Sequence, residues 1–129
     1  MQVKWQLLNL YNIMTKVHTI DATDKVLGHV ASAAAKALMG KTDPSYTHNQ
    51  VADVRVYIKN ASKTKMTERR MNETLHETYS GQAGGFKTKT NAKIIDKKGW
   101  LGLYELAVFG MLPANKLRPL MMKRLTITE

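Results

Sequence analysis

The sequence predicts an α/β domain whose sheet is largely parallel. A short β-prone segment comes first, an alanine-rich segment with helical spacing follows, and an alternating segment typical of a second strand comes next. Later helical segments and a last short β-prone segment complete the pattern. The chain has no internal repeat and no long linker, and its 129 residues suit one domain.

The first half predicts a strand at 17–21, a helix at 27–38, a loop at 43–45 and a strand at 51–58. Thr23 or Asp24 is expected to cap the helix, and Gly40 to end it. The helix prediction depends on apolar residues at helical spacing, namely Leu27, Val30, Ala31, Ala34 and Leu38. In the second strand, alternation places three apolar residues on one side, namely Val54, Val56 and Ile58.

The second half predicts a polar turn at 60–67, a weak strand at 74–79 and a glycine-rich loop at 81–85. Helices at 91–97 and 100–110 follow, then a helical turn or two at 115–124 and a strand at 125–128. Gly99 is the expected joint between the two helices. Pro113 is expected to end the second helix, because the residue before a proline is pushed out of the α region. We expect that helix to place five side chains in the core, namely Leu106, Val108, Phe109, Met111 and Leu112.

The charge favours a polyanionic partner. Lys and Arg number 20 against 10 acids, which gives a net charge of +10, and residues 86–129 carry most of the excess. Neutralising a phosphate backbone releases counterions and so drives binding. A basic surface without a ligand is the alternative. The absence of cysteine excludes disulfides and cysteine zinc sites and favours an intracellular protein, and no run of about 18 apolar residues predicts a membrane span.

Catalytic motifs are absent from the sequence. The four histidines do not fall at metal-ligand spacing, and no Gly-x-Ser-x-Gly occurs. Gly40-Lys41-Thr42 spells the end of a phosphate-binding Walker loop, but Ala35 stands where the upstream glycine should be. We therefore expect no enzyme, no cofactor, no metal and no small-molecule substrate.

RNA-binding features are better supported. Residues 62–70 mix four cations with hydroxyl groups that can bond phosphate oxygens. Aromatic rings in predicted loops could stack on unpaired bases or could cover the edge of a small core. Gly84 and Gly85 would let another backbone approach or would simply serve a turn, and Lys87 and Lys89 directly after them favour contact with phosphate.

The amino-terminal residues 1–13 have two interpretations. They contain six large apolar residues broken by Asn9 and Asn12, which is compatible with an amphipathic helical extension. Alternatively, translation begins at Met14, and the domain covers residues 14–129. No signal peptide is expected, since the segment lacks an uninterrupted apolar stretch and a cleavage site.

From about Met14 onward, the chain resembles the ribosomal protein L13 family of the large subunit. The matching stretches occur in the family order at 19–22, 27–32, 39–41, 46–48, 58–61, 79–81, 84–85 and 107–113. The resemblance implies a three-layer α/β/α sandwich with a mostly parallel sheet of about four strands. It also implies a cytoplasmic, structural protein that binds large-subunit ribosomal RNA early in assembly, beside neighbouring ribosomal proteins. His29 stands where the family usually has arginine, and Gln82-Ala83 replaces the usual aromatic-proline pair.

Residues and resemblance together predict RNA contacts at Lys41, Tyr46, His48, Lys63, Lys65, Arg69, Arg70, His76, Tyr79, Ser80, Gly81, Gly84, Gly85, Lys87, Lys89, Lys116, Arg118, Lys123 and Arg124. A non-ribosomal RNA-binding or translational regulatory module on the same scaffold is the alternative. A nucleotide-dependent enzyme is a third class, but residues 22–25 lack the glycine fingerprint that should follow the first strand.

Overall fold

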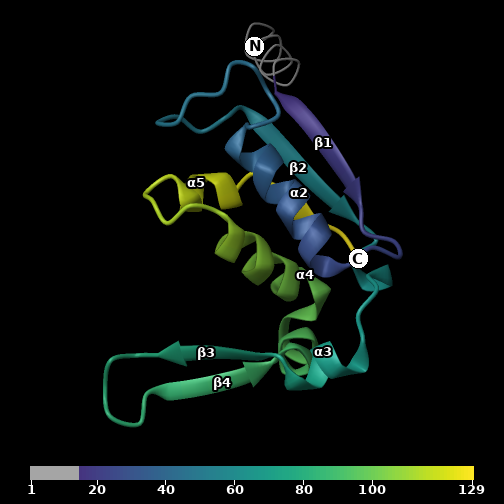
Figure 1. Cartoon of the computed structure of the whole chain (residues 1–129), viewed down its shortest axis with the longest axis vertical. Helices are drawn as coiled ribbons and strands as arrows, with labels where there is room; N and C mark the ends of the chain where they lie inside the picture. Colours follow the sequence, from purple (N-terminus) through teal and green to yellow (C-terminus); the bar gives the residue numbers. More distant parts are fainter. Residues whose placement is uncertain (1–14) are drawn as a thin grey trace, which may run out of the picture.

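A computed structural model of the chain describes residues 15–129, so the interpretations of residues 1–13 lie outside the described residues. The elements follow in the order β1 (Lys16–Asp21), α2 (Leu27–Met39), β2 (Val54–Lys59), the 3₁₀ helix η1 (Ala61–Lys63), α3 (Glu68–Glu73), β3 (Leu75–Tyr79), β4 (Phe86–Thr90), α4 (Asn91–Met111), α5 (Arg118–Met122) and β5 (Leu125–Ile127) (Figure 1).

The main sheet is parallel and has the strand order β1-β2-β5. This confirms an α/β fold with a mostly parallel sheet, although the described residues form three strands of it instead of about four. The weak strand predicted at 74–79 exists, but β3 pairs with β4 in a separate antiparallel hairpin. The β2 strand of the main sheet buries three residues on one face, whereas β3 has no buried residue and so no apolar face to pack on the core.

Helix α2 packs on one face of the sheet, and alanines let its backbone approach closely. Val56 and Ile58 of β2 are fully buried against Val30 and Leu38 of α2. Gly40 ends the helix in the left-handed conformation, with φ of 78°, as expected. The expected amino-terminal cap is wrong: the helix begins after Val26, and Thr23 bonds the Asp21 carboxylate instead.

Helix α4 bends at Gly99, where φ is 70° and ψ is −175°, which confirms two helical segments joined there. A side chain at this position would be strained at that φ and would lie 2.5 Å from Glu129 Oε1. The Trp100 N–H, just after the bend, donates to the same Oε1 at 3.0 Å.

The second half of α4 buries the Tyr104 side chain. The Tyr104 hydroxyl donates at 2.5 Å to Thr64 Oγ1, which itself donates to the Ala61 carbonyl. Burial raises the pKa of Tyr104.

The end of α4 corrects the predicted core. Leu112, just before Pro113, is extended with ψ of 149°, so the helix ends where expected. Only Val108 and Leu112 of the five expected core residues are buried. They continue the face of Tyr104 at a spacing of four residues, whereas the other three, Leu106, Phe109 and Met111, point elsewhere around the helix and are exposed.

The molecule has two parts of different character. We call β1, α2, β2, β5 and the second half of α4 the body, and residues 68–90, which form α3 and the β3–β4 hairpin, the arm. Figure 1 shows the hairpin at the far end of the molecule from the start of β1. Helix α3 was not predicted, and it has no buried residue.

Candidate nucleic-acid interface

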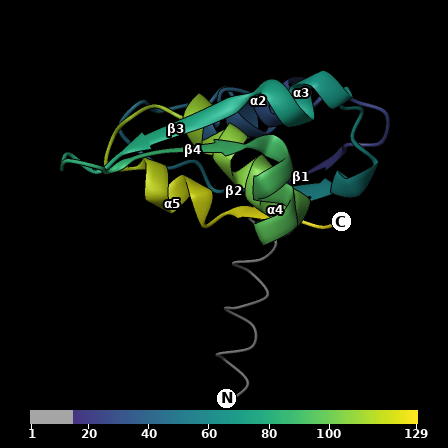
Figure 2. The ribbon, with the colours of Figure 1, turned by 90° about the horizontal axis from the view of Figure 1, so that it is seen from below.

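The predicted RNA-binding residues fall into four groups along the chain. They lie on the loop after α2, on the segment from η1 to α3, on the hairpin and around α5. In Figures 1 and 2, the loop after α2, the hairpin tip and the loop before α5 all project toward the same side of the molecule. We call these loops, residues 41–50, 80–85 and 113–117, the loop edge. The cations of η1 and α3 lie outside it.

The hairpin tip presents an exposed aromatic pair. Tyr79 and Phe86 are directly paired across the two strands and are 65% and 57% exposed. Strand alternation places Lys87 and Lys89 on the opposite face of the hairpin. The tip can therefore offer rings to bases on one face and cations to phosphates on the other. Phe86 was missed by the sequence reasoning, and the available signal was an aromatic residue directly after the glycine pair.

The tip loop requires its glycines. Gly81 and Gly84 have φ of 84° and 75°, in the left-handed region. A Cβ at Gly85 would lie 1.9 Å from Ser80 Oγ and 3.0 Å from the Gln82 carbonyl oxygen, so a larger residue would require the Ser80 side chain to rotate away. The loop and the adjoining strand ends enclose a hollow of about 340 Å³ that includes Tyr79 and Lys87.

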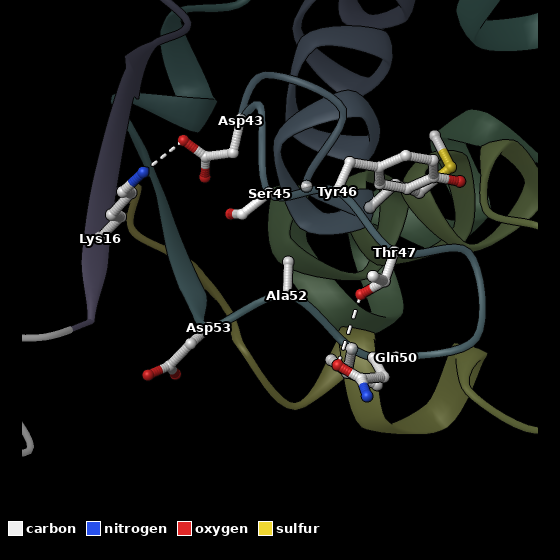
Figure 3. Close-up of a pocket in the computed structure, with 11 residues that line it drawn as sticks. Lys16, Asp43, Ser45, Tyr46, Thr47, Gln50, Ala52 and Asp53 are labelled. Carbon is white, nitrogen blue, oxygen red and sulfur yellow. Dashed lines mark hydrogen bonds and ion pairs between the residues drawn. The ribbon is translucent and has the colours of Figure 1, made fainter.

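The loop after α2 forms a second hollow, of about 320 Å³ (Figure 3). Lys16 of β1 pairs with Asp43 at its border. The Tyr46 hydroxyl and His48 Nδ1 are 3.2 Å apart, and the Tyr46 ring is 40% exposed. Lys41 is exposed nearby. The ring therefore remains accessible, although it also lies close to the end of α2.

His76 lies in the junction between arm and body. Asn91 Nδ2 donates to the Arg70 carbonyl at 2.8 Å, so its Oδ1 is the acceptor for His76 Nε2–H at 2.6 Å. Asn91 is buried and His76 half-buried. The same region carries exposed cations, of which Arg69 pairs with Glu73 at 2.7 Å. The remaining exposed ones are Lys63, Lys65 and Arg70.

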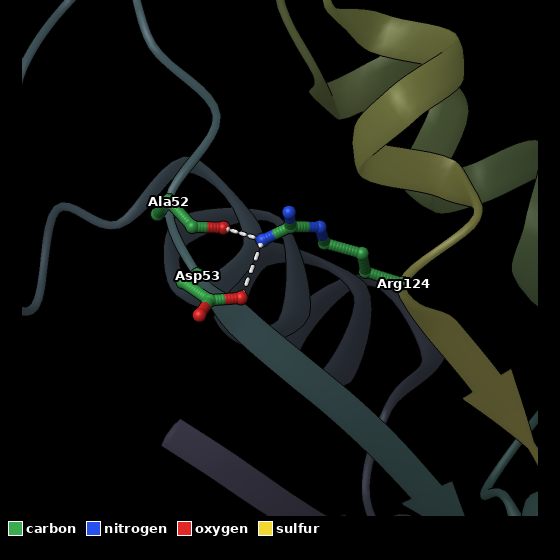
Figure 4. Close-up of polar contacts among 3 residues, drawn as sticks. All are labelled: Ala52, Asp53 and Arg124. Carbon is green, nitrogen blue, oxygen red and sulfur yellow. Dashed lines mark hydrogen bonds and ion pairs between the residues drawn. The ribbon is translucent and has the colours of Figure 1, made fainter. Parts of the chain in front are cut away.

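The two arginines around α5 bond the protein itself. Arg118 donates to the carbonyls of Leu112 and Pro113, both at 3.0 Å, and lies 4.4 Å from the centroid of the Phe109 ring. Arg124 reaches the Ala52 carbonyl and lies 3.2 Å from Asp53 Oδ1 (Figure 4). Lys116 and Lys123 are exposed and make no ion pair within the part of the chain that the structure describes.

Asp21 joins the ends of β1 and β2. Its Oδ1 accepts from Asn60 Nδ2 at 3.0 Å and from the hydroxyl of Thr23 at 2.7 Å. These hydrogen bonds, that of Asn60 first, lower the pKa of Asp21 from 3.8 to about 2.

In residues 15–129, no three histidine or acidic side chains gather in a way that could hold a metal ion. None of the helices in these residues is long and apolar enough to cross a membrane.

A family model, ribosomal protein L13, matches residues 15–129. The chain belongs to the ribosomal protein L13 family. Large ribosomal subunit protein uL13 of Caldanaerobacter subterraneus subsp. tengcongensis is 40% identical over 117 residues, which cover 90% of this chain and 80% of that protein. The protein of the same name from Geobacter sp. (strain M21) is 35% identical and covers 97% and 87%. The one from Mycoplasmopsis synoviae is 37% identical and covers 86% and 76%. The family predicted from the sequence is thereby confirmed.

Proposed function

We propose that this protein is a structural constituent of the large ribosomal subunit, binds large-subunit ribosomal RNA and supports early assembly of the subunit. The observation that carries the proposal is the family match over the whole described domain, residues 15–129, with relatives that are named large ribosomal subunit proteins. Neighbouring ribosomal proteins are further partners, and the protein works in the cytoplasm, inside the ribosome.

The surface supports RNA as the main partner. The net charge of +10 favours a polyanion, and the loop edge and the hairpin each carry exposed lysines together with rings that could stack on bases. Tyr79 and Phe86 are the most accessible of these rings. Such a combination recognises unpaired nucleotides by stacking and the backbone by charge.

We infer a binding role without catalysis. The described acids near the hollows are engaged with cations, as Asp43 is with Lys16 and Asp53 with Arg124. No resolved pKa shift in the described part of the chain belongs to a pair of groups suited to general acid and base chemistry. A small-molecule substrate or cofactor is not part of the proposal.

Co-sedimentation separates the ribosomal role from that of a free RNA-binding or regulatory module. The full-length protein is expected to remain with purified large subunits after washing in high salt, in an amount that approaches one copy for each subunit. Loss of the protein into the wash, with retention on free RNA at low salt, would favour the free module.

Charge neutralisation tests the hairpin lysines. Lys87→Gln with Lys89→Gln is expected to weaken binding to large-subunit ribosomal RNA and to reduce the slope of log affinity against log salt, by roughly 0.7–0.9 for each phosphate that the variant no longer neutralises. Fluorescence anisotropy over a salt series measures this slope. The matched control is Lys36→Gln with Lys97→Gln, two exposed helix positions outside the proposed contacts, and an equal slope change in the control would contradict the assignment.

A further inference from the structure

Within residues 15–129, one face of the main sheet has no helix packed on it, and Thr19, Arg55 and Lys59 of that face are exposed. Helix α2 lies in front of the strands in Figure 1, so the opposite face points away from the viewer. The parallel register places Thr19, Tyr57 and Thr126 in one row across the three strands. Arg55 and Lys59 lie two positions on either side of Tyr57, on the same face of β2. We call this surface, made of Val17, Thr19, Arg55, Tyr57, Lys59 and Thr126, the open face.

The open face has unpaired positive charge. Arg55, Lys59 and the adjacent Lys123 are exposed and form no ion pair among residues 15–129. The two acids at its borders are already engaged, Asp53 with Arg124 and Asp21 with Asn60 and Thr23. Neither acid forms an ion pair with any of the three cations in residues 15–129, and with Arg124 included the surface has four cations against these two acids, so its excess of positive charge favours an external anion.

A hollow of about 220 Å³ opens on this surface between β2 and β5. Arg124 forms one wall, because the Ala52 carbonyl and Asp53 hold its guanidinium in place (Figure 4). Asp53, paired with Arg124, also lines the hollow, and the remaining lining residues are Arg55, Tyr57, Lys123 and Thr126. Hydroxyl and cationic donors around one hollow match the oxygens of a phosphate group.

We propose that an RNA strand crosses the open face, with its phosphates bound by Arg55, Lys59 and Lys123 and with Tyr57 and Thr126 as hydroxyl donors beneath it. This rests on the proposed function only in that the partner is RNA. An apolar occupant fits poorly, since Val17 is the sole large exposed apolar residue of this face in the described structure. The open face and the loop edge point in different directions, so the protein would hold two separate stretches of RNA at once.

The absence of cysteine allows a direct test with single thiols. Thr126→Cys places a thiol on the open face, and Tyr79→Cys places one at the hairpin tip. Each full-length variant carries a thiol-linked photocrosslinker, is assembled into large subunits and is irradiated, and the crosslinked partner is identified. We expect both variants to crosslink to ribosomal RNA, at different nucleotides.

The outcomes separate the two claims. RNA crosslinks from Tyr79→Cys alone would overturn the open-face contact and leave the proposed function intact. Failure of both variants to reach RNA would count against the proposed function itself. Crosslinks from Thr126→Cys to a ribosomal protein or to residues 1–14 would give the open face a protein occupant and would also overturn the inference.

A charge measurement gives an independent test. Arg55→Gln with Lys59→Gln is expected to reduce the salt slope of RNA binding by about 1.4–1.8, as for two phosphates that are no longer neutralised. Lys36→Gln with Lys97→Gln removes the same charge at exposed helix positions and is expected to change the slope little. Circular dichroism checks that both variants are folded. Equal slopes for the two variants would attribute the effect to net charge and would overturn the site.

Discussion

In the body, three of the six residues of β2 are buried, whereas neither β3 nor β4 of the arm has a single buried residue. The body is held by packing: α2 and α4 enclose a contiguous core with the apolar sides of the strands. The arm is held by the hydrogen bonds of its own hairpin and by its attachment to α4. An isolated two-stranded hairpin is only marginally stable in water. The comparison indicates that the body contributes stability and the arm contributes contact surface.

Matched truncations in the two parts should have opposite effects. Leu38→Ala empties a fully buried position of the body and is expected to cost about 2–5 kcal/mol of unfolding free energy. Tyr79→Ala removes an exposed ring and is expected to change stability by less than about 0.5 kcal/mol while it weakens RNA binding. Urea unfolding and RNA anisotropy measure the two quantities. Similar stability losses in both variants would break the comparison.

Asn91 is the place where the two parts depend on each other. Asn91→Ala would leave the Arg70 carbonyl and His76 without their partner, and we expect a loss of about 1–3 kcal/mol. The amides of β3 and β4 should also exchange hydrogen faster, because the base of the hairpin loosens. Hydrogen-exchange mass spectrometry resolves this, with the exposed Asn72→Ala as control. Unchanged exchange in the hairpin would show that the arm is held by other contacts.

Arg118 of α5 tests a contact with the second half of α4, in the body, at a residue that the sequence assigned to RNA. Arg118→Ala removes two hydrogen bonds to the carbonyls at the end of α4 and the cation–π contact with Phe109, and should cost about 1–2 kcal/mol. Lys116→Ala, at an exposed position nearby, serves as control and should leave stability nearly unchanged. Thermal unfolding compares the two. An Arg118→Ala variant as stable as the control would return this side chain to the RNA-contact group.

Asp21 gives the smallest effect, and it depends on pH. Its folded pKa of about 2 lies below the usual 3.8, so the carboxylate stabilises the folded state above pH 3.8, and this contribution is lost as the pH falls toward 2. The effect is modest because Asp21 is exposed. Asp21→Asn should therefore differ in melting temperature from the unchanged protein at pH 5 and converge with it in acid. A constant difference across this range would contradict the role of the carboxylate.

Sequence reasoning worked where periodicity decides the structure. The spacing in α2 identified its buried face, alternation identified β2, and Gly99 marked the bend in α4. It failed where tertiary contacts decide. The partner of β3 was not visible, because a short polar strand can pair locally or join a sheet. Phe109 was expected in the core by its apolar character, although its position around the helix points it outward.

The sequence predicted which residue types the candidate interface contains, but not which of their side chains face solvent and which contact the protein itself. Exposed lysines and rings of the loop edge lie where loops were expected, and their contacts with RNA remain predictions. Arg118 and Arg124 have the same residue type as a phosphate-binding arginine, but nearby carbonyls and Asp53 occupy some of their donors, and their contacts with RNA also remain predictions. Arg55 and Lys59 were overlooked as possible RNA contacts. The sequence shows that they share one face of a strand, but it does not show whether helices cover that face.

The bend at Gly99 sets the direction in which the hairpin extends from the body. The first half of α4 directly follows the hairpin, and the second half packs in the core. A five-residue strand extends roughly 17 Å, so a rotation of about 10° at its base moves the far end by roughly 3 Å. That displacement is as large as a hydrogen bond is long. The position of the hairpin tip therefore depends on the backbone angle at Gly99, far from the tip itself. The hydrogen bond from the Trp100 N–H to Glu129 stabilises that angle.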